Sequence, residues 1–580
     1  MKNIYIILLC LTIYALSSSC EEMFGDFLDK APGVDVTSDT IFSAQRQCET
    51  FIAGMYSWGT MGQQTENDER MPGTGFWAGA SDEGEETAAW FFPNSWNAGN
   101  VTPENNLDIK SNTRWISIRK ANILLEKIND VKDADQSYKD IARGEALFIR
   151  ALNYFDLFKF FGGIPIVDKS LTVDDQYYIP RSSVKEIVDF IVKDCSEAAS
   201  LLPNVWATTA YGRATKGAAL ILKAKVLLYA ASPLFNSVTP YLDLPGHNDL
   251  LCYGTSDNNR WQLAADAAKA VLDWAPSGGI ALVTNFGTDK NYKAVWEKPN
   301  NSEIILTHNI KGLIKVGQPP IRFLRPPVFY TGLSGITVPL NFVKFYRKND
   351  GTPQTWNMAG GNDLNQKYAD MEQRFKQTFA YNLSYWNVDF PVVQLWQADP
   401  ANKITAGAHL NKCTGGVWMH KFLPDALRQN VGVYPFESLF RLAEAYLYYA
   451  EALNEAQGPI PAAYDAINAI RNRSGLPNLT PGLTKEQFRV EVRLEFTIEM
   501  AYDDHRFWNL RRWMTAEEEG VMKGNMYGIK IYRIIPATNP VQYRYVPYVF
   551  ESRVFHRRFY LHPFPQSEVN KNYIIQNPGY

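Results

Sequence analysis

The chain has 580 residues, of which 46% are hydrophobic and 21% are charged. This composition supports a large buried core and is not that of a disordered chain. The formal net charge is −3, so the chain lacks the basic surplus typical of nucleic-acid-binding proteins. Aromatic residues reach 13%, and we expect some of these rings at surfaces or interfaces as well as in the core.

The first twenty residues are predicted to direct export. Lys2 precedes an apolar run over 4–16, which is shorter than the ~20 residues that a membrane-spanning helix needs. Small residues then lead to Cys20, and acidic residues follow it. This pattern resembles the signal of Bacteroidota surface lipoproteins, in which residues 1–19 would be removed and Cys20 would carry lipid such as palmitate. The alternative is cleavage by an ordinary signal peptidase, with Cys20 incidental.

Four further cysteines follow the signal at positions 48, 195, 252 and 413. They are far apart and lack the spacing of a metal site. We expect them to be free, with one unassigned disulfide as the alternative. The sequence predicts no cofactor and no metal ion.

Helical patterns dominate two parts of the chain. Helices are expected near 38–55 and over 115–129, 141–161, 184–202, 214–231 and 261–274. In 438–477, apolar residues recur at spacings of three and four, Gly458 and Pro459 end the pattern, and a second helix follows. Two helices joined within about three dozen residues are typical of a tetratricopeptide hairpin. The alternative is an ordinary helical domain with alanine-rich helices.

Two upstream segments, 144–163 and 214–233, share the pattern of small residues followed by Tyr or Leu about one turn later. A single helix pair cannot bury its apolar face, so stacked pairs supply the core for one another. We therefore predict a mainly α fold. Its tetratricopeptide-like helical repeat scaffold would cover about 38–275 and 437–514.

The block over about 283–436 differs from the helical parts. It is rich in Pro, Gly, Asn and aromatic residues and has only short strand-like runs. We predict a loop-rich, irregular insertion lobe here, which is a natural place for a binding face. The helices resume with the long segment 485–514, and the tail is expected to be irregular. No long linker divides the chain, so 20–580 is read as a single domain.

An early loop carries several large rings, and an acidic run lies at 82–86. Rings on a Gly- and Asn-rich loop either pin it onto the core or form a ligand platform. The acidic run is expected to be solvated, with contact to calcium or to sugar hydroxyls as the alternative.

The charge-rich segment 493–508 is a candidate catalytic site, because His505 lies beside Asp503 and Asp504. Consecutive helical residues point about 100° apart, so the two aspartates cannot jointly face one substrate. The segment is better read as paired charges that lock helices together, through Arg493, Glu495, Glu499 and Arg506. The sequence has no nucleophile elbow, zinc-binding helix or phosphate loop, so we predict no catalytic residue and no enzyme activity.

Five segments in order resemble the SusD/RagB family of outer-membrane nutrient-binding lipoproteins. They are 141–167, 212–230, 441–456 with 467–477, 493–513, and 563–580, which ends in AsnProGlyTyr. The SusD-like resemblance implies a tetratricopeptide-like scaffold bearing a loop-rich binding lobe. It also implies oligosaccharide or polysaccharide ligands, peptides in some relatives, and a SusC-like TonB-dependent outer-membrane transporter as partner.

The sequence is therefore interpreted as a surface-exposed lipoprotein of the cell outer membrane. It would bind glycan nutrients and deliver them to the SusC-like transporter for carbohydrate uptake. Three alternatives stay open: a RagB-like peptide-binding lipoprotein, a repeat adaptor that binds only protein, and a secreted glycan hydrolase. The hydrolase would need two carboxylates about 5–10 Å apart in a cleft.

A sugar offers apolar C–H faces bordered by hydroxyls, so its receptor needs flat rings with polar groups at their edges. Two irregular segments supply such residues, and in the SusD-like family the ligand site likewise combines an early loop with the middle of the chain. The early-loop candidates are Trp77, Asp82, Trp90, Trp96 and Asn97. The lobe candidates are Tyr292, Trp296 and Tyr330.

Overall fold

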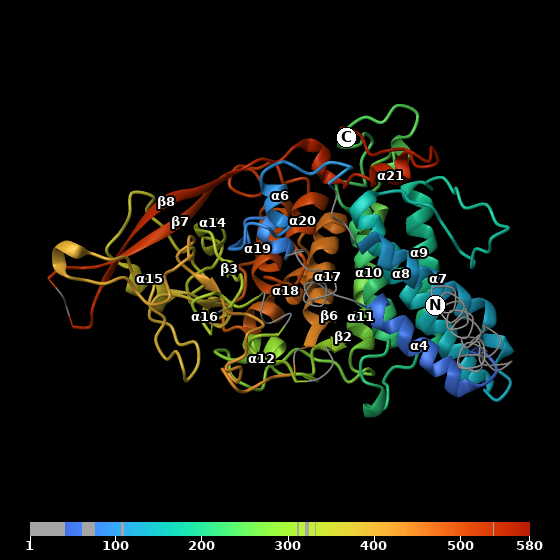
Figure 1. The fold of residues 1–580 in the computed structure, drawn as a ribbon, viewed down its shortest axis with the longest axis horizontal. Coiled ribbons are helices and arrows are strands. Elements are labelled where there is room, and N and C mark those ends of the chain that lie inside the picture. The colour runs from blue at the N-terminus through green and yellow to red at the C-terminus, as the bar shows by residue number, and fades with distance from the viewer. Residues whose placement is uncertain are drawn as a thin grey trace, which may run out of the picture.

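The computed structural model describes residues 41–60, 76–105, 110–309, 313–318, 324–330, 332–434, 436–536 and 539–580. The predicted signal at 1–19 and the predicted lipidation site Cys20 lie outside the described residues. As predicted, the chain is mainly helical. Long helices lie at the right of Figure 1 and a loop-rich lobe lies at its left.

The helical half is a row of helices that pack on their neighbours in chain order. Its members are α4 (Gln45–Gly59), α7 (Lys110–Lys127), α8 (Gln136–Phe161), α9 (Val184–Leu201), α10 (Lys216–Ala231), α11 (Asn259–Trp274), α17 (Leu442–Gln457), α18 (Pro461–Arg473) and α19 (Lys485–Glu499). Helix α17 packs on α11 although the whole lobe lies between them in the sequence. Such nearest-neighbour stacking is that of a tetratricopeptide-like repeat scaffold.

Small residues let these helices approach closely. Gly217 on α10 lies against the ring of Trp274 on α11, where an added Cβ would come within 2.0 Å of the ring. Ala443 and Ala450 on α17 are fully buried. The predicted use of small residues for close helix contact is therefore confirmed at Gly217.

Polar residues define where several helices begin. The side chain of Asp135 accepts a hydrogen bond from an amide in the first turn of α8, and Thr215 does the same for α10. Ser183 and Glu186 form a reciprocal capping box at the start of α9. Each cap satisfies an amide that has no partner inside the helix.

The structure corrects two predicted helical segments. Residues 436–441 form β6 (Phe436–Arg441), which pairs antiparallel with β2 (Ile304–Asn309), so α17 begins only at Leu442. The segment 485–514 is two helices, α19 and α20 (Arg506–Arg512), separated by a turn. Tyr502 and Asp504 in this turn have φ of 62° and 58°, a left-handed backbone that cannot continue a helix.

The lobe contains little regular structure, as predicted. Its sheet has the strand order β1 (Glu85–Glu86), β3 (Ile336–Thr337), β5 (Trp418–Met419) and β4 (Phe379–Ala380). Among the described residues of the lobe, four short helices accompany it: α12 (Asn291–Glu297), α14 (Leu340–Val343), α15 (Leu364–Asp370) and α16 (Gln373–Thr378). Because β1 belongs to the early loop, this sheet fixes that loop to the lobe.

The tail was predicted to be irregular, but it contains a long hairpin. Strands β7 (Gly524–Arg533) and β8 (Tyr543–Arg553) pair antiparallel and extend along the lobe in Figure 1. Ile529, Ile531 and Tyr545 from this hairpin are buried in the core of the lobe. The chain then returns to the helical half and ends near α21 (Gln566–Val569).

The C-terminal end of α19 joins the two halves. Phe496 and Met500 are buried in the core of the helical half, whereas Ile498 and Tyr502 are buried in the core of the lobe. The turn at 500–505 therefore belongs to both cores, and the residues around it can couple the scaffold to the lobe.

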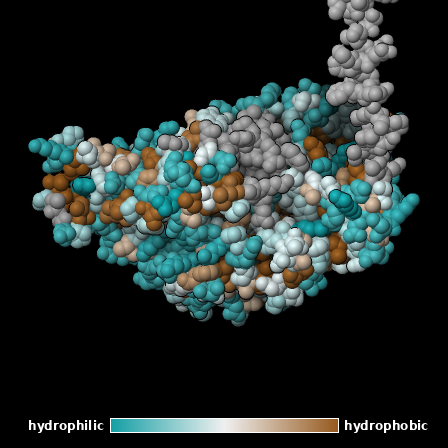
Figure 2. All heavy atoms as spheres, turned by 60° about the horizontal axis from the view of Figure 1, so that its bottom comes forward, coloured by the Kyte–Doolittle hydropathy of each residue, from teal (hydrophilic) through white to brown (hydrophobic). Residues whose placement is uncertain are grey.

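The surface is mixed in character. Figure 2 shows hydrophobic side chains among hydrophilic ones over the loop-rich end, at the left of the view. Among the described residues, no helix is both long and apolar enough to span a membrane.

Candidate functional site

Buried ion pairs hold the lobe on the scaffold. We call them the junction network; its members are Glu303, Arg374, Arg441, Arg473, Glu495 and Glu499. Arg441 Nη1 lies 2.8 Å from Glu303 and 2.6 Å from Glu499. Arg374 in the lobe lies 2.5 Å from Glu495 on α19. Burial raises the pKa of Glu499, but Arg473, Arg441 and Arg374 outweigh it and keep the pKa well below its usual value.

These contacts confirm the prediction that Glu495 and Glu499 each form ion pairs with cations from other segments. They also confirm it for Arg506, whose Nε and Nη2 lie 2.8 and 2.7 Å from the carboxylate of Asp82. Arg493 differs, because its guanidinium lies over the Trp513 ring, 4.9 Å from the centroid. His505 is buried, with Nε2 3.3 Å from Glu444 Oε2, and burial lowers its pKa. We interpret His505 as part of the packing.

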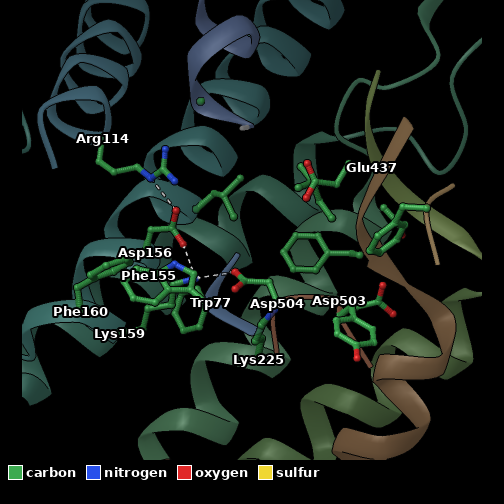
Figure 3. Close-up of a pocket in the computed structure, with 17 residues that line it drawn as sticks. Trp77, Arg114, Phe155, Asp156, Lys159, Phe160, Lys225, Glu437, Asp503 and Asp504 are labelled. Carbon is green, nitrogen blue, oxygen red and sulfur yellow. Dashed lines mark hydrogen bonds and ion pairs between the residues drawn. The ribbon is translucent and has the colours of Figure 1, made fainter. Parts of the chain in front are cut away.

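A cavity of about 90 Å³ lies beside the junction network, between α8, α10 and the 502–504 turn. Figure 3 shows the charged side chains that line it, together with the rings of Trp77, Phe155 and Phe160. Asp156 lies 2.6 Å from Arg114 and 3.0 Å from Lys159. Ligand sites for drug-sized molecules usually have about 300–1,000 Å³, so this cavity can hold only a small group.

Strained backbone lines part of this cavity. Three of its lining residues, Phe422, Tyr502 and Asp504, have positive φ values of 69°, 62° and 58°. Such conformations cost of order 1–3 kcal/mol each and persist only where the surroundings enforce them. The strain indicates that this junction is held in a particular geometry.

Four of the predicted binding rings are buried. Trp77 and Trp96 pack against each other and against Phe507. Tyr292 donates a hydrogen bond to the Glu499 carbonyl oxygen, and Trp296 lies beside the same junction. Trp77 lines the cavity, and Tyr292 and Trp296 line a smaller adjoining one. The structure thus brings the early loop and the lobe together, but in the core, where these rings offer no open face for stacking.

Asp82, Glu83 and Glu86 of the acidic run are buried and Glu85 is only partly exposed, so the predicted solvation of the run is wrong. Asp82 pairs with Arg506, and Glu85 pairs with Arg553 at 2.7 Å. Glu83 accepts a hydrogen bond from the Tyr502 amide, and burial raises its pKa to about 8. The predicted site residue Asn97 is also buried, and its amide donates to the Gly79 carbonyl oxygen at 2.9 Å. Cations and amides from distant segments therefore replace water around this run.

Two predicted rings do reach the surface. The Trp90 side chain is 53% exposed and lies against the ring of Phe91, with centroids 4.2 Å apart. Tyr330 is partly exposed and has φ of 54°, which is unusual for a bulky residue. Its hydroxyl donates to Asp389 at 2.5 Å and accepts from Asn387 at 3.0 Å.

Arg428 completes the polar edge beside Tyr330. Its Nη2 donates to Asp389 at 2.5 Å, and this contact lowers the pKa of Asp389. Sequence reasoning did not identify Asp389, Asn387 or Arg428, since no motif or periodicity marks them. We call the surface formed by Trp90, Tyr330, Asp389 and Arg428 the ring face; the buried Asn387 lies behind it and holds the Tyr330 hydroxyl.

The two ring-bearing segments are joined by direct contacts. Glu85 and Glu86 in β1 pair with Thr337 and Ile336 in β3. Phe91, which supports Trp90, packs against Leu333 in the segment that follows Tyr330. The early loop and the middle of the chain therefore meet at the surface as well as in the core.

No disulfide links the four described cysteines, which are free and buried. Within the described ranges, no group of His, Cys, Asp and Glu is arranged to hold a metal ion. The chemistry that the ring face offers is stacking, hydrogen bonding and charge.

Family comparisons agree with this architecture. Residues 291–580 match the model of the SusD family, and residues 26–228 match a model described as starch-binding associating with outer membrane. The chain belongs to the SusD family. It is 22% identical to SusD-like protein P25 of Formosa agariphila over 542 residues, which covers 85% of this chain and 87% of that protein. A second protein of that organism, SusD-like protein P38, is 34% identical over 132 residues, a quarter (25%) of its length.

Solved structures share the fold. A SusD-like protein from Bacteroides fragilis superposes with a TM-score of 0.75 at 25% identity, covering 95% of this chain and all (100%) of that one. A laminarin-binding SusD-like protein superposes with a TM-score of 0.60 at 20% identity, covering 93% of this chain and 100% of the other. These likenesses establish a SusD-like architecture of a tetratricopeptide-like scaffold with a loop-rich lobe.

Proposed function

We propose that this chain is a cell-surface lipoprotein of the outer membrane that binds oligosaccharides or polysaccharides. It would deliver them to a SusC-like TonB-dependent transporter. The observation that carries this proposal is the ring face, where the exposed Trp90 ring and the strained Tyr330 lie on joined segments. The laminarin binding of one structural neighbour and the starch-binding description of one matching family model support the same class of ligand.

The ring face suits a neutral sugar. A pyranose stacks its C–H face on an indole or phenol ring, and its hydroxyls bond to groups at the ring edge. Asp389 accepts hydrogen bonds, whereas Arg428 carries donors. Asp389 already pairs with Arg428, so this edge carries no net charge. Each well-placed ring can contribute about 1 kcal/mol beyond its buried area.

We infer that the chain binds its ligand without cleaving it. Glycoside hydrolysis needs one carboxylic acid that can give up a proton and a second carboxylate opposite to it. On the ring face, Asp389 is the acidic member, and Arg428 and Tyr330 lower its pKa, so it favours the ionised form. This is the wrong protonation state for a general acid.

Equilibrium dialysis against neutral oligosaccharides, including laminarin fragments, tests the proposal. We expect the free ligand to be depleted without the appearance of new reducing ends. New reducing ends would instead identify a hydrolase. Binding of peptides but of no oligosaccharide would identify a peptide-uptake lipoprotein, and co-purification with a transporter but with neither ligand would identify an adaptor.

A further inference from the structure

A groove of about 520 Å³ lies on the helical half. Its walls come from the end of α10 and the loop after it, the start of α11, the end of α17, and α19. The lining residues are Ala231, Pro233, Asn236, Ser237, Ser256, Trp261, Glu455, Arg489 and Arg493. None of them belongs to the lobe or to the ring face. The volume lies within the range of about 300–1,000 Å³ that is usual for sites binding small molecules.

The two arginines of the groove have different surroundings. Arg489 lies against both carboxylate oxygens of Glu455, at 2.5 and 2.6 Å. Arg493 makes no ion pair with any described residue, and its buried Nε has no hydrogen-bond acceptor there. Its guanidinium is held over the Trp513 ring. The Arg493 side chain is therefore held in place, but no described carboxylate forms an ion pair with its positive charge.

The carboxylates that act electrostatically on Arg493, those of Glu451 and Glu455, already have partners. Glu451 receives hydrogen bonds from Arg512 at 2.7 and 2.6 Å and from the Trp513 indole at 2.7 Å. Burial lowers the pKa of Arg493. The negative charges of Glu451 and Glu455 oppose that change, and the positive charges of Arg512 and Arg489 add to it. With Glu455 paired to Arg489, the groove has one positive charge in excess. A partly buried cation of this kind favours an anionic group beside it.

The rest of the groove offers contacts for a sugar ring. Trp261 is partly exposed at the start of α11. The buried Ser237 hydroxyl has no hydrogen-bond partner among the described residues, and Ser256 is exposed at the rim. An aromatic face with hydroxyl groups at its edge is the arrangement that binds a pyranose.

We propose that this groove binds a saccharide unit carrying a carboxylate, such as a uronic acid. The carboxylate would lie on Arg493 and the sugar ring on Trp261. This inference deepens the proposed function and rests on it, because it assumes that the ligand is a saccharide. The groove would let the protein prefer acidic glycans, while the ring face takes neutral units.

The test uses the full chain and two probes. One is an oligosaccharide that ends in glucuronic acid, and the other is its neutral counterpart ending in glucose. Isothermal titration at low salt should show tighter binding of the acidic probe, and Arg493→Gln should weaken that binding about tenfold or more, a loss expected for a charge-assisted contact. Arg493→Lys should retain part of the preference for the acidic probe. Trp261→Ala should weaken binding of the acidic probe. The matched control is Arg143→Gln, a solvent-accessible arginine on α8 that pairs with Glu197 at 2.8 Å.

Two further measurements keep the outcome decisive. Melting temperatures of the Arg493 variants show whether a loss of binding reflects a loss of folding, and Arg493→Lys supplies the folded comparison. A Trp90→Ala/Tyr330→Ala variant should keep its preference for the acidic probe, because the ring face and the groove share no residue. Equal affinity of the wild type for both probes, or an unchanged preference in Arg493→Gln, overturns the groove assignment. Failure of the wild type to bind any saccharide overturns the proposed function instead. Binding of inorganic sulfate without binding of the acidic probe would show an anion site that is not a sugar site.

Discussion

Arg506 and Asp82 form a buried ion pair between segments 424 residues apart, with hydrogen bonds of 2.8 and 2.7 Å. Arg506 begins α20 of the scaffold, and Asp82 lies in the early loop that supplies β1 and Trp90. The pair therefore ties the loop behind the ring face to the helical half. Its position makes it a direct test of how the two parts are held together.

Arg506→Ala should destabilise the protein by about 3–5 kcal/mol, because it leaves Asp82 buried without its cation. Urea unfolding measures this loss. The control is Lys185→Ala, which removes an exposed pair with Asp189 whose side chains are 70% and 61% exposed. Exposed pairs contribute only about 0–1 kcal/mol. Equal effects of the two substitutions would contradict a structural role for the buried pair.

Helix α17 provides a test of close packing. Ala443→Leu or Ala450→Leu should each cost about 1–3 kcal/mol, because both positions are fully buried and extra methylene groups overpack a filled core. Ser196→Leu on the exposed face of α9 is the matched control and should change stability far less. Similar melting temperatures for all three variants would argue against the stacked arrangement. Glu455 on the same helix cannot serve as a control, because it is largely buried and bonded to Arg489.

The stability of the protein should depend on pH through the ionisation of Glu86. This carboxyl group accepts hydrogen bonds from the Phe76 amide and Ser334, yet burial raises its pKa from 4.5 to about 7. A raised pKa means that the folded state keeps a proton that the unfolded state has lost. The stability contribution is therefore fully present below pH 4.5 and falls as the pH rises to about 7, by on the order of 3 kcal/mol.

Urea unfolding at several pH values checks this effect. Glu86→Gln has the shape of the protonated acid but no ionisable group. It should remove the part of the decline in unfolding free energy between pH 5 and pH 7 that Glu86 causes, a window set by that pKa shift, while the raised pKa of Glu83 still contributes its own part. The same decline in wild type and variant would show that other groups cause it.

The lipid anchor predicted from the sequence is tested separately. Cys20→Ala should release the protein from the membrane fraction, because stable anchoring needs more than one acyl chain on this residue. Fractionation followed by mass spectrometry of the mature N-terminus measures both the location and the modification. Unchanged membrane association, with no lipid on the wild-type N-terminus, would contradict the prediction.

The helical scaffold could be predicted because its signals are local. Spacing, caps and small residues such as Gly217 lie within or beside the helix that they define. The β7–β8 hairpin was missed because its register depends on contacts with the lobe. The burial of the acidic residues of α17 likewise depends on distant segments and could not be predicted from the local sequence. Glu444 and Glu451 lie off the apolar face, yet both are buried, where they pair with Lys225, His505 and Arg512 from other segments.

The site was harder to predict than the fold. Trp90 lies on the early loop and Trp96 on the short helix α6 (Pro93–Asn97) directly after it, but Trp96 is covered by Phe559 and His562 from the far end of the chain, whereas Trp90 is exposed. Local sequence carries no information about that cover. Substituting Trp96 or Trp296 would therefore remove core volume, at about 3–5 kcal/mol for a large ring, and would report folding as much as binding.

The central claim is that saccharides bind at the ring face, and isothermal titration of Trp90→Ala and Tyr330→Ala tests it most directly. Both side chains reach the surface, and their support comes from Phe91, Asp389 and Asn387. We expect each substitution to weaken binding of a neutral oligosaccharide that the wild type binds, and the pair together to weaken it at least about tenfold, since two rings contribute about 2 kcal/mol. The melting temperature should change little for Trp90→Ala. Full affinity in the double variant would contradict the assignment of the ring face as the saccharide site.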